Sequence, residues 1–339
     1  MENCKHLKTL LALLLALLFV LMPQLAAPQT AEAATAIVST ADKKYTYSDL
    51  KTDIQQLAKR YPDRLTVQKL GSTADGRFLY ALVLGNPEAE KQIFVTAGMH
   101  AREYINCQVT MKMVEYYCQN YTTDKYKGQT YERLFDRVSI CVMPMVNPDG
   151  IAISALGTSA IRDKALRAKV KKMPRSGAYS NWQANARGVD LNRNYKMYSG
   201  WPSTKTYASQ YYPGPKRFSE AETRAVLAAM DSCSDIKAVI NYHSMGRVIY
   251  WGYHSKKYEA DCWSFVKLFK DMTGYSTIDE SYTKATYGDF EHYVMHEYKV
   301  PYVCIENGKN TVPVPHSEFS SIYSKNKLGF AKAAYHFYQ

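Results

Sequence analysis

A histidine and a glutamate three residues apart are the starting point for chemistry in this sequence. His100 and Glu103 lie in Ala97–Ile105 (A-G-M-H-A-R-E-Y-I), after an apolar run at 92–97 and before an expected helix at 108–120. This spacing puts both side chains on one side of a helical turn. An imidazole nitrogen and a carboxylate oxygen suit Zn²⁺, which keeps an open position for water in catalytic sites. Alone, the pair more often marks a surface histidine beside a helix-start glutamate.

A third metal ligand has to come from elsewhere in the chain, and His243 is the strongest candidate. It follows the apolar run at 236–242 and precedes a turn at Gly246. In open α/β sheets, sites form outside the carboxyl ends of the strands. The alternative is a histidine buried for structural reasons. The other histidines outside the first 33 residues fall on expected loops or helix faces: His254, His292, His296, His316 and His336.

Glu306 is the candidate general base. It closes the apolar run at 302–305 and is followed by Asn307 and Gly308. A hydrolytic zinc site needs a base close to its water. A buried carboxylate at a strand end is unfavourable unless it faces a cleft or a partner. The alternative is an ion pair at the end of the strand.

A second cluster, Gly188–Asn194 (G-V-D-L-N-R-N), combines an amide with a guanidinium. The adjacent Asn192 and Arg193 are the kind of pair that holds a substrate carboxylate, because the arginine fork makes two parallel contacts with such a group. The alternative is a structural arginine that binds loop carbonyls. We treat both residues as candidate substrate contacts.

The elements that must position these residues alternate between strand and helix. Such alternation predicts a single α/β domain with a mixed sheet flanked by helices. We expect Ser48 and Ser219 to cap helices, 147–150 to form a turn, and 151–218 to be a long irregular functional region. The expected helices are 48–60, 108–120, 219–230, 256–273, 289–297 and 320–338, and the strands are 65–70, 78–84, 92–97, 137–146, 236–242, 247–252 and 302–306.

The first 33 residues read as a secretory signal peptide. Lys5 and Lys8 precede the apolar stretch Leu10–Leu21, and Ala31–Ala33 supplies a small-x-small cleavage site. No second apolar stretch is long enough to cross a bilayer, so we expect an exported protein without a membrane span. The expected division is 1–33 signal peptide, 34–42 short segment and 43–339 catalytic domain, which leaves no room for a globular pro-domain.

The chain is basic, with 43 Lys and Arg against 31 Asp and Glu, a formal net charge of +12. Such a charge in an exported protein favours anionic surroundings, such as a cell wall or an acidic substrate. The basic residues are scattered along the sequence and no nucleic-acid motif is present. We therefore expect a solvated basic surface and no nucleic-acid partner.

Seven cysteines are present, and Cys4 falls in the signal peptide. The remaining six permit disulfides in an exported protein, but Cys141 and Cys304 lie in strand-like runs, and Cys107 and Cys118 in an expected helix. Such cysteines are often small buried hydrophobic residues. With no C-x-x-C pair, the sequence does not support a cysteine-ligated metal.

From residue 43 to the C-terminus, the chain resembles the zinc metallocarboxypeptidases similar to carboxypeptidase A. The resemblance rests on six motifs in the family's order: H-A-R-E-Y-I (100–105), N-P-D-G (147–150), G-V-D-L-N-R-N (188–194), P-G-P-K-R-F-S-E-A-E-T (213–223), N-Y-H-S (241–244) and C-I-E-N-G (304–308). It implies a carboxypeptidase A-like fold and one zinc ion per chain, held by His100, Glu103 and His243. Glu306 maps onto the family's general base.

The same resemblance implies the substrate contacts. Asn192 and Arg193 map onto the pair that binds the free C-terminal carboxylate, and Arg102 maps onto a secondary contact. The mobile tyrosine of the family maps onto Tyr282, with Tyr287 as a rival because the spacing does not decide between them. The implied substrate is a peptide with a free C-terminal carboxylate, cleaved one residue at a time.

The chain departs from the family pattern at the arginine that stabilises the oxyanion. Gln183, after Trp182, stands at the expected place, and a neutral amide stabilises an oxyanion less than a cation does. Either Arg187 or an arginine upstream substitutes, or turnover is reduced. Gly288, just before Asp289, stands at the expected base of the side-chain pocket. A glycine there predicts an open, uncharged pocket with no preference for basic side chains.

Two alternatives to a general carboxypeptidase remain open. Some bacterial relatives cut the bond between γ-D-glutamate and a diamino acid in cell-wall peptides, which fits an exported basic protein. A wall-binding protein that has lost turnover is the second alternative, suggested by Gln183. The intact set of His100, Glu103, His243 and Glu306 argues against loss of activity.

Overall fold

The computed structural model describes residues 35–41, 44–175, 177–198, 206–281 and 288–339. Contacts divide the chain into Met1–Ala36 and Ile37–Gln339, and the fold below is that of the second part. Tyr282 and Tyr287 lie outside the described residues, so their expected role stays a prediction. Within the described residues, no helix is both long and apolar enough to cross a membrane.

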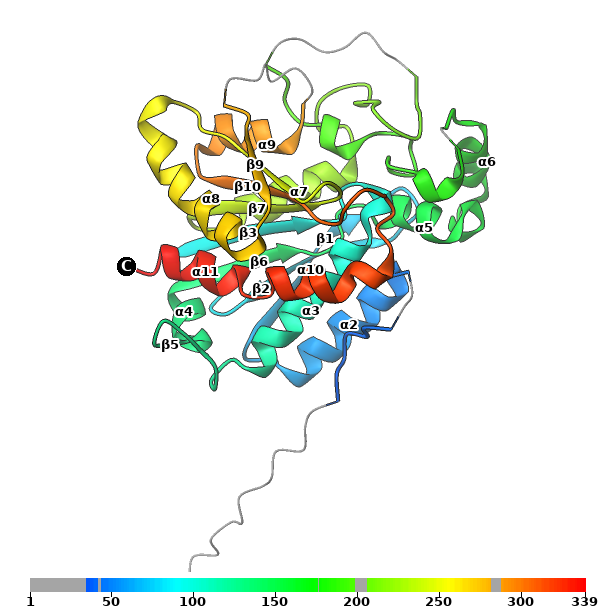
Figure 1. The fold of residues 1–339 in the computed structure, drawn as a ribbon. Helices are drawn as coiled ribbons and strands as arrows, with labels where there is room; N and C mark the ends of the chain where they lie inside the picture. Colours follow the sequence, from blue (N-terminus) through cyan, green and yellow to red (C-terminus); the bar gives the residue numbers. More distant parts are fainter. Residues whose placement is uncertain (1–34, 42–43, 176, 199–205, 282–287) are drawn as a thin grey trace, which may run out of the picture. The chain divides into compact units, whose positions relative to one another are not determined.

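One mixed sheet of eight strands forms the centre of the fold (Figure 1). In spatial order the strands are β1 (Leu65–Ser72), β2 (Phe78–Leu84), β6 (Val138–Met143), β3 (Lys91–Ala97), β7 (Ile236–His243), β10 (Tyr302–Glu306), β8 (Val248–Trp251) and β9 (Ser276–Asp279). β6, β3, β7 and β10 run parallel, whereas β2 and β8 are antiparallel to their neighbours in this group. A separate hairpin joins β4 (Lys125–Tyr126) and β5 (Gln129–Thr130). The α/β mixed-sheet prediction is therefore confirmed.

Helices cover both faces of this sheet. They are α2 (Tyr47–Arg60), α3 (Ile105–Gln119), α4 (Tyr131–Arg137), α5 (Pro148–Leu156), α6 (Lys164–Lys172), α7 (Ala221–Asp231), α8 (Glu259–Thr273), α9 (Phe290–Tyr293), α10 (Phe319–Asn326) and α11 (Gly329–His336). Side chains alternate along β3, so Ile93 and Val95 join the apolar cluster under α2, α3, α8, α10 and α11. Phe94 joins the opposite cluster, under α7 and α9.

The prediction of a turn at 147–150 is wrong, because these residues begin helix α5. Asn147 is the N-cap, its side chain accepts from the Gly150 amide, and Pro148 occupies the first turn. Proline is well tolerated there because the amide it lacks has no partner within the helix. The region 151–218 is correspondingly less irregular than expected, since it holds most of α5 and all of α6, which begins at the Asp163 cap.

Several element boundaries also differ from the predictions. Thr46, and not Ser48, caps α2 through a capping box with Asp49. Glu220, and not Ser219, is the N-cap of α7, because the Ser219 hydroxyl is engaged by Asn194 and Glu220. The expected closing helix breaks between α10 and α11, and the short edge strand β9 was missed. These changes do not affect the prediction of a mixed sheet flanked by helices.

The six cysteines among the described residues form no disulfide. They are Cys107, Cys118, Cys141, Cys233, Cys262 and Cys304. All except Cys233 are buried, which agrees with their interpretation as small apolar residues of the interior.

Candidate active site

Three neighbouring parallel strands bring the predicted residues to one edge of the sheet. In the ladder between β7 and β10, His243 pairs directly with Glu306. In the ladder between β7 and β3, Ala97 pairs with Tyr242. His100, three residues after Ala97, therefore lies just beyond the same edge of the sheet. Gly98 turns the chain there with a φ of +67°, and a Cβ on it would lie 2.4 Å from the Cys107 sulfur. The turn into the H-x-x-E segment therefore requires glycine.

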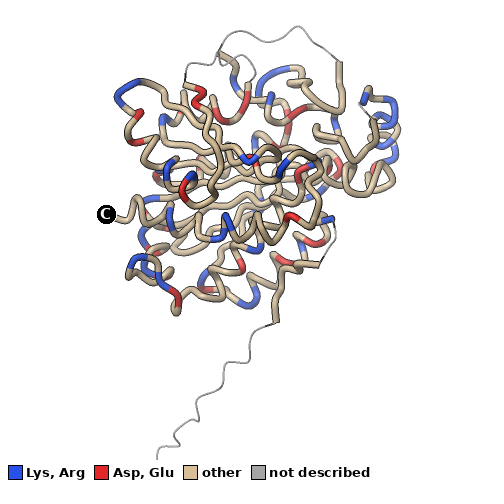
Figure 2. Tube along the Cα trace, in the orientation of Figure 1, with Lys and Arg blue, Asp and Glu red and all other residues tan. Residues whose placement is uncertain are grey.

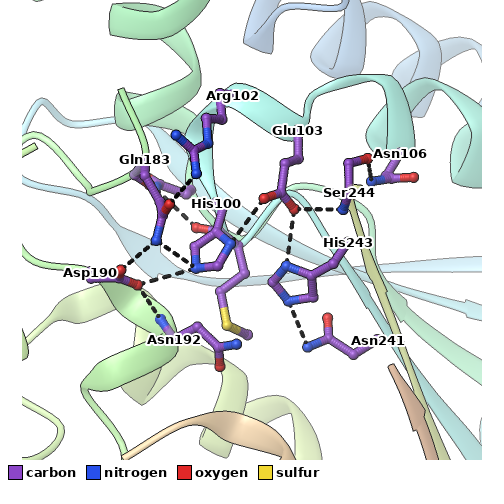
Figure 3. Close-up of polar contacts among 12 residues, drawn as sticks. His100, Arg102, Glu103, Asn106, Gln183, Asp190, Asn192, Asn241, His243 and Ser244 are labelled. Carbon is purple, nitrogen blue, oxygen red and sulfur yellow. Dashed lines mark hydrogen bonds and ion pairs between the residues drawn. The ribbon is translucent and has the colours of Figure 1, made fainter. Parts of the chain in front are cut away.

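The two histidines and Glu103 converge on one point (Figure 3). Nδ1 of His100 lies 3.0 Å from Glu103 Oε1, and Nδ1 of His243 lies 2.9 Å from Glu103 Oε2. Glu103 and His243 are only 2% and 1% exposed. The three residues form a group with metal-binding geometry, and two imidazole nitrogens with one carboxylate are a donor set that zinc takes in hydrolytic enzymes. The residues present therefore fit a zinc ion.

A second layer of polar contacts orients this donor set. The far nitrogen of His100, Nε2, lies 3.2 Å from Asp190 Oδ1, and the Ser244 amide donates to Glu103 Oε2 at 3.0 Å. A carboxylate on the far nitrogen fixes the tautomer that leaves the near nitrogen available to a metal. Asp190 was not predicted as part of the site. Its place inside the G-V-D-L-N-R-N motif was the signal that could have identified it.

The electrostatics of the group favour a positive charge at its centre. Burial lowers the pKa of His100, but the charges of Glu103 and Asp190 outweigh burial and raise the pKa to about 10. Burial disfavours the ionised form of Glu103, yet His100 and His243 hold its pKa at about 2. Carboxylates and imidazoles thus stabilise each other's charged forms, as expected where a divalent cation binds.

Glu306 faces the same space with one oxygen unengaged. Among the described residues, its Oε2 is buried and has no hydrogen-bond partner. Burial, together with the charges of Glu103 and Glu291, raises the pKa of Glu306 to about 8 despite the opposing effect of His243. A carboxylate with a pKa near neutrality and an open oxygen beside a metal site is suited to accept and return a proton.

A cavity of about 390 Å³ opens beside the metal site. Its described lining combines the site residues with further charged groups: His100, Asn192, Arg193, His243, Tyr250, Glu280, Asp289, Glu291, His292, Cys304 and Glu306. Arg193, a predicted substrate contact, therefore lines the cavity. The Asn192 side chain is held at the start of α9, where it donates to Glu291 Oε2 at 3.2 Å and accepts from the Phe290 amide.

The prediction of an uncharged side-chain pocket is wrong. Gly288 packs against the backbone, since a Cβ on it would lie 2.7 Å from the Arg193 carbonyl oxygen and 2.9 Å from that of Tyr195. Its lack of a side chain therefore serves a close backbone approach. The charge of the cavity is set by Glu280, Asp289 and Glu291, which no position in the motif pattern had indicated.

Gln183 does not point toward a substrate as an oxyanion donor would. Its Nε2 donates to Asp190 Oδ2 at 2.6 Å, and its Oε1 accepts from Arg102 Nη2 at 2.6 Å (Figure 3). Gln183 thereby links Arg102 to the carboxylate behind His100. Arg187 lies outside this constellation, because its guanidinium pairs with Glu220 at 3.2 Å. Of the cations considered from the sequence, Arg102 is the one that the structure connects to the metal ligands.

Comparison with known proteins decides the family. A model of the zinc carboxypeptidase family matches residues 50–314, which is more than half of the chain. The chain belongs to the zinc carboxypeptidase family. The enzyme is thus a zinc-dependent peptidase, and the family, enzyme class and cofactor expected from the motifs are confirmed.

Its relatives include enzymes of two kinds. The chain is 28% identical to gamma-D-glutamyl-L-diamino acid endopeptidase 1 of Lysinibacillus sphaericus, over 84% of this chain and 70% of that protein. It is 30% identical to mast cell carboxypeptidase A of Rattus norvegicus, over 59% of this chain and 45% of that protein. Among solved structures it resembles thrombin activatable fibrinolysis inhibitor, with a TM-score of 0.68 and 22% identity over 91% and 78% of the two chains. That last likeness concerns the fold alone.

Proposed function

We propose that this zinc carboxypeptidase releases single residues from the C-terminus of peptides, with His100, Glu103 and His243 as zinc ligands and Glu306 as general base. The observation that carries the proposal is the pairing of His243 with Glu306 across two adjacent strands. It sets a carboxylate with an open oxygen and a raised pKa beside the metal ligands.

When bound, zinc supplies Lewis acidity and lowers the pKa of a water molecule toward neutrality. The chain's own residues transfer the proton and hold the substrate. Glu306 accepts the proton of the attacking water and returns it to the leaving amine, a task for which a pKa near the working pH is best. Arg193 binds the C-terminal carboxylate through its guanidinium, and Asn192 supports it from the adjacent position. This placement limits cleavage to the last peptide bond.

Arg102 is proposed as the secondary substrate contact. Its guanidinium is held by the Gln183 side chain and by the Asn181 carbonyl, at 2.6 and 3.4 Å. A cation held in this way beside the metal ligands would be able to stabilise developing negative charge on the substrate. The closing tyrosine predicted at Tyr282 lies outside the described residues and is kept as a prediction.

Cleavage of γ-D-glutamyl-diamino acid bonds in wall peptides is the second candidate function. It is favoured by the similarity to the Lysinibacillus sphaericus endopeptidase, which extends over 84% of this chain. The two functions require the same zinc ligands and the same base. They differ in the residue and linkage on the acyl side of the scissile bond.

Export and wall association complete the proposal. Residues 1–33 are proposed as the signal peptide and 43–339 as the catalytic domain. One segment of the chain carries a local concentration of basic residues. Between 162 and 175, seven Lys or Arg residues stand against one Asp, a net charge of +6 that is half of the chain's formal +12. They gather on and around α6 (Figure 2), where Lys169, Lys172 and Arg187 line a cavity of about 680 Å³.

This α6 surface suits a phosphate-rich wall polymer. We expect the protein to sediment with purified cell walls at low salt and to be released as salt screens the charges. Exchanging Lys169, Lys171 and Lys172 for Gln is expected to reduce this binding, whereas exchanging the exposed Lys256 and Lys257 is not. Equal binding by both variants would contradict the role of α6.

Hydrolysis tests the catalytic proposal. The zinc-loaded protein is incubated with N-blocked peptides ending in Phe, Leu, Lys or Arg, and separately with wall peptides that contain a γ-D-glutamyl-diamino acid bond. Release of single C-terminal residues from the first set supports the carboxypeptidase. Cleavage of the wall peptides alone would place the second function first, and no cleavage of either set would refute both.

A further inference from the structure

A network of buried polar side chains connects the segments that carry the zinc ligands and the proposed base, and no step described so far uses it. Its members are buried and come from four separate parts of the chain: Asn106 near the start of α3, Tyr275 before β9, Asn307 after β10 and Asn326 at the end of α10. A buried amide is unfavourable unless its donors and acceptors find partners. The positions of these four segments therefore depend on one another.

Asn307 is the centre of this network. Its Nδ2 donates to Asn106 Oδ1 at 3.0 Å. Its Oδ1 accepts from Asn326 Nδ2 at 3.0 Å and from the Tyr275 hydroxyl at 3.2 Å. The amide thus uses one donor and both lone pairs of its oxygen, on partners from three segments. A side chain held from three sides has one orientation, and it fixes the backbone that carries it.

The backbone at Asn307 joins the segment of the proposed base to that of a zinc ligand. The Asn307 amide donates to the His243 carbonyl oxygen at 2.8 Å, and the Arg247 amide donates to the Glu306 carbonyl oxygen at 2.8 Å. The segments that follow β7 and β10 are therefore hydrogen-bonded to each other just beyond the sheet. The Asn307 side chain anchors this pair of segments to the protein interior.

A second branch of the network reaches the zinc ligand Glu103. Asn106 Nδ2 donates to Ser244 Oγ at 3.0 Å, and the Ser244 amide donates to Glu103 Oε2 at 3.0 Å (Figure 3). Hydrogen bonds therefore run from Asn307 through Asn106 and Ser244 to Glu103. The metal ligands and the residue next to the proposed base share one buried support.

From this geometry we infer that Asn307 is a positioning residue for hydrolysis, which holds the Glu306 carboxylate at its working distance from the metal ligands. The inference rests on the proposed function, because it takes Glu306 as the base. Among the described residues, Glu306 Oε2 has no hydrogen-bond partner, so its place depends on the backbone that carries it. A base must lie within hydrogen-bond reach of its proton, and a misplacement of about 1 Å can lower the rate about 100-fold.

Asn307→Ala tests this role, because it removes the anchor and leaves Glu306 and the zinc ligands chemically unaltered. Hydrolysis is measured at one zinc per chain, with whichever of the two substrate sets the native protein cleaves. We expect kcat to fall about 10- to 100-fold, since the base is displaced from the attacking water. KM is expected to change less than about threefold, because the residues that bind the substrate lie on another segment.

Tyr45→Phe is the control for a loss of stability alone. Tyr45 is 1% exposed, and its hydroxyl donates at 2.6 Å to Asp53 on α2, a helix that contributes no described residue to the cavity. Both variants leave a buried polar group with one partner fewer, so both are expected to unfold more easily than the native protein. Only Asn307→Ala is expected to lose kcat, and an equal loss in Tyr45→Phe would overturn the inference.

Two further variants connect the effect to the network. Asn106→Ala breaks the same hydrogen bond from the other side, so the double variant is expected to lose less kcat than the product of the two single losses. Independent, multiplying losses would contradict a shared support. Tyr275→Phe removes one hydrogen bond to Asn307 and replaces Asn307→Ala if that protein does not fold. We expect it to lower kcat about three- to tenfold at unchanged KM, and an unchanged kcat would count against the inference.

The outcomes separate this inference from the proposed function. A native protein and an Asn307→Ala protein with equal kcat would overturn the inference and leave the carboxypeptidase intact. If the native protein cleaves neither substrate set, the proposed function fails, and amide hydrogen exchange of the zinc-loaded proteins decides the inference. The Gly246 and Arg247 amides, which donate to the Gly308 and Glu306 carbonyl oxygens, are expected to exchange at least about tenfold faster in Asn307→Ala. Unchanged exchange would refute the anchoring role of Asn307.

Discussion

Replacing Asp190 by asparagine offers a sharp test of the site. The change puts a hydrogen-bond donor where the native side chain has an acceptor, and it leaves the shape of that side chain unchanged. Asp190 Oδ2 accepts from Gln183 Nε2 at 2.6 Å and from the Tyr211 amide at 3.1 Å. The asparagine side chain would keep its oxygen on that side, where two donors require an acceptor. Its NH₂ group would then face His100 Nε2, which lies 3.2 Å from Oδ1 in the native protein.

The expected loss of zinc affinity in this variant follows from the tautomer of His100. A metal on Nδ1 requires the proton on Nε2, and an amide donor in front of Nε2 favours the opposite tautomer. Exchanging a charged acceptor for a donor costs roughly 1.5–3 kcal/mol, so we expect Zn²⁺ to bind about 10- to 100-fold more weakly in Asp190→Asn. Some loss of folding stability is expected as well, because the Asn192 amide also donates to Oδ1.

The assay is competition for Zn²⁺ with a chromophoric chelator, with circular dichroism as the check on folding. Asp149→Asn is the matched control. Asp149 is also fully buried and accepts from Thr73 and Arg77, but it has no contact with the metal ligands. We expect this control to unfold more easily and to bind zinc normally once folded. A folded Asp190→Asn protein with a zinc Kd within twofold of the native value would refute the tautomer argument.

Two further predictions concern pH. Zinc must displace a proton from His100, whose pKa is about 10, and a second from His243, whose pKa is raised, so its apparent affinity is expected to rise by roughly tenfold to a hundredfold per pH unit between pH 6 and 8. A chelator titration showing a flat profile would contradict this. Burial and the charges of Asp149 and Glu220 raise the pKa of Glu222 to about 8, so the folded state binds more protons than the unfolded chain between about pH 4.5 and 8. The free energy of unfolding should therefore fall as the pH rises through that window, by on the order of a few kcal/mol more in the native protein than in Glu222→Gln. Denaturant titrations at several pH values measure this difference. The same pH dependence of unfolding free energy in both proteins would rule it out.

The sequence sufficed to predict that four candidate residues lie together, for a physical reason. His243 and Glu306 each follow a short apolar run, and the carboxyl ends of neighbouring parallel strands meet at one edge of a sheet. The strand-to-helix turn after β3 brings His100 and Glu103 to the same edge. Local patterns and one rule of sheet topology are therefore enough to predict that these four residues lie together, although they are far apart in the chain.

The surroundings of the site could not be predicted in the same way. The direction of the Glu291 side chain depends on how the short helix α9 packs against Asn192 and Asn241, and no sequence period encodes that packing. Gly288 looked like an open position because its contact with the Arg193 backbone is a tertiary one. Gln183 left open whether another arginine substitutes or turnover is reduced, because its contacts with Asp190 and Arg102, which it links in space, are tertiary ones.

The most direct test of the account is the effect of Glu306→Gln on turnover at constant zinc content. The variant keeps the size of the side chain and removes the base. With one zinc per chain in both proteins, we expect kcat for the released C-terminal residue to fall by about 10²- to 10⁴-fold, with the far-UV circular dichroism unchanged. A zinc-loaded Glu306→Gln protein that retains kcat within a few-fold of the native value would contradict the account.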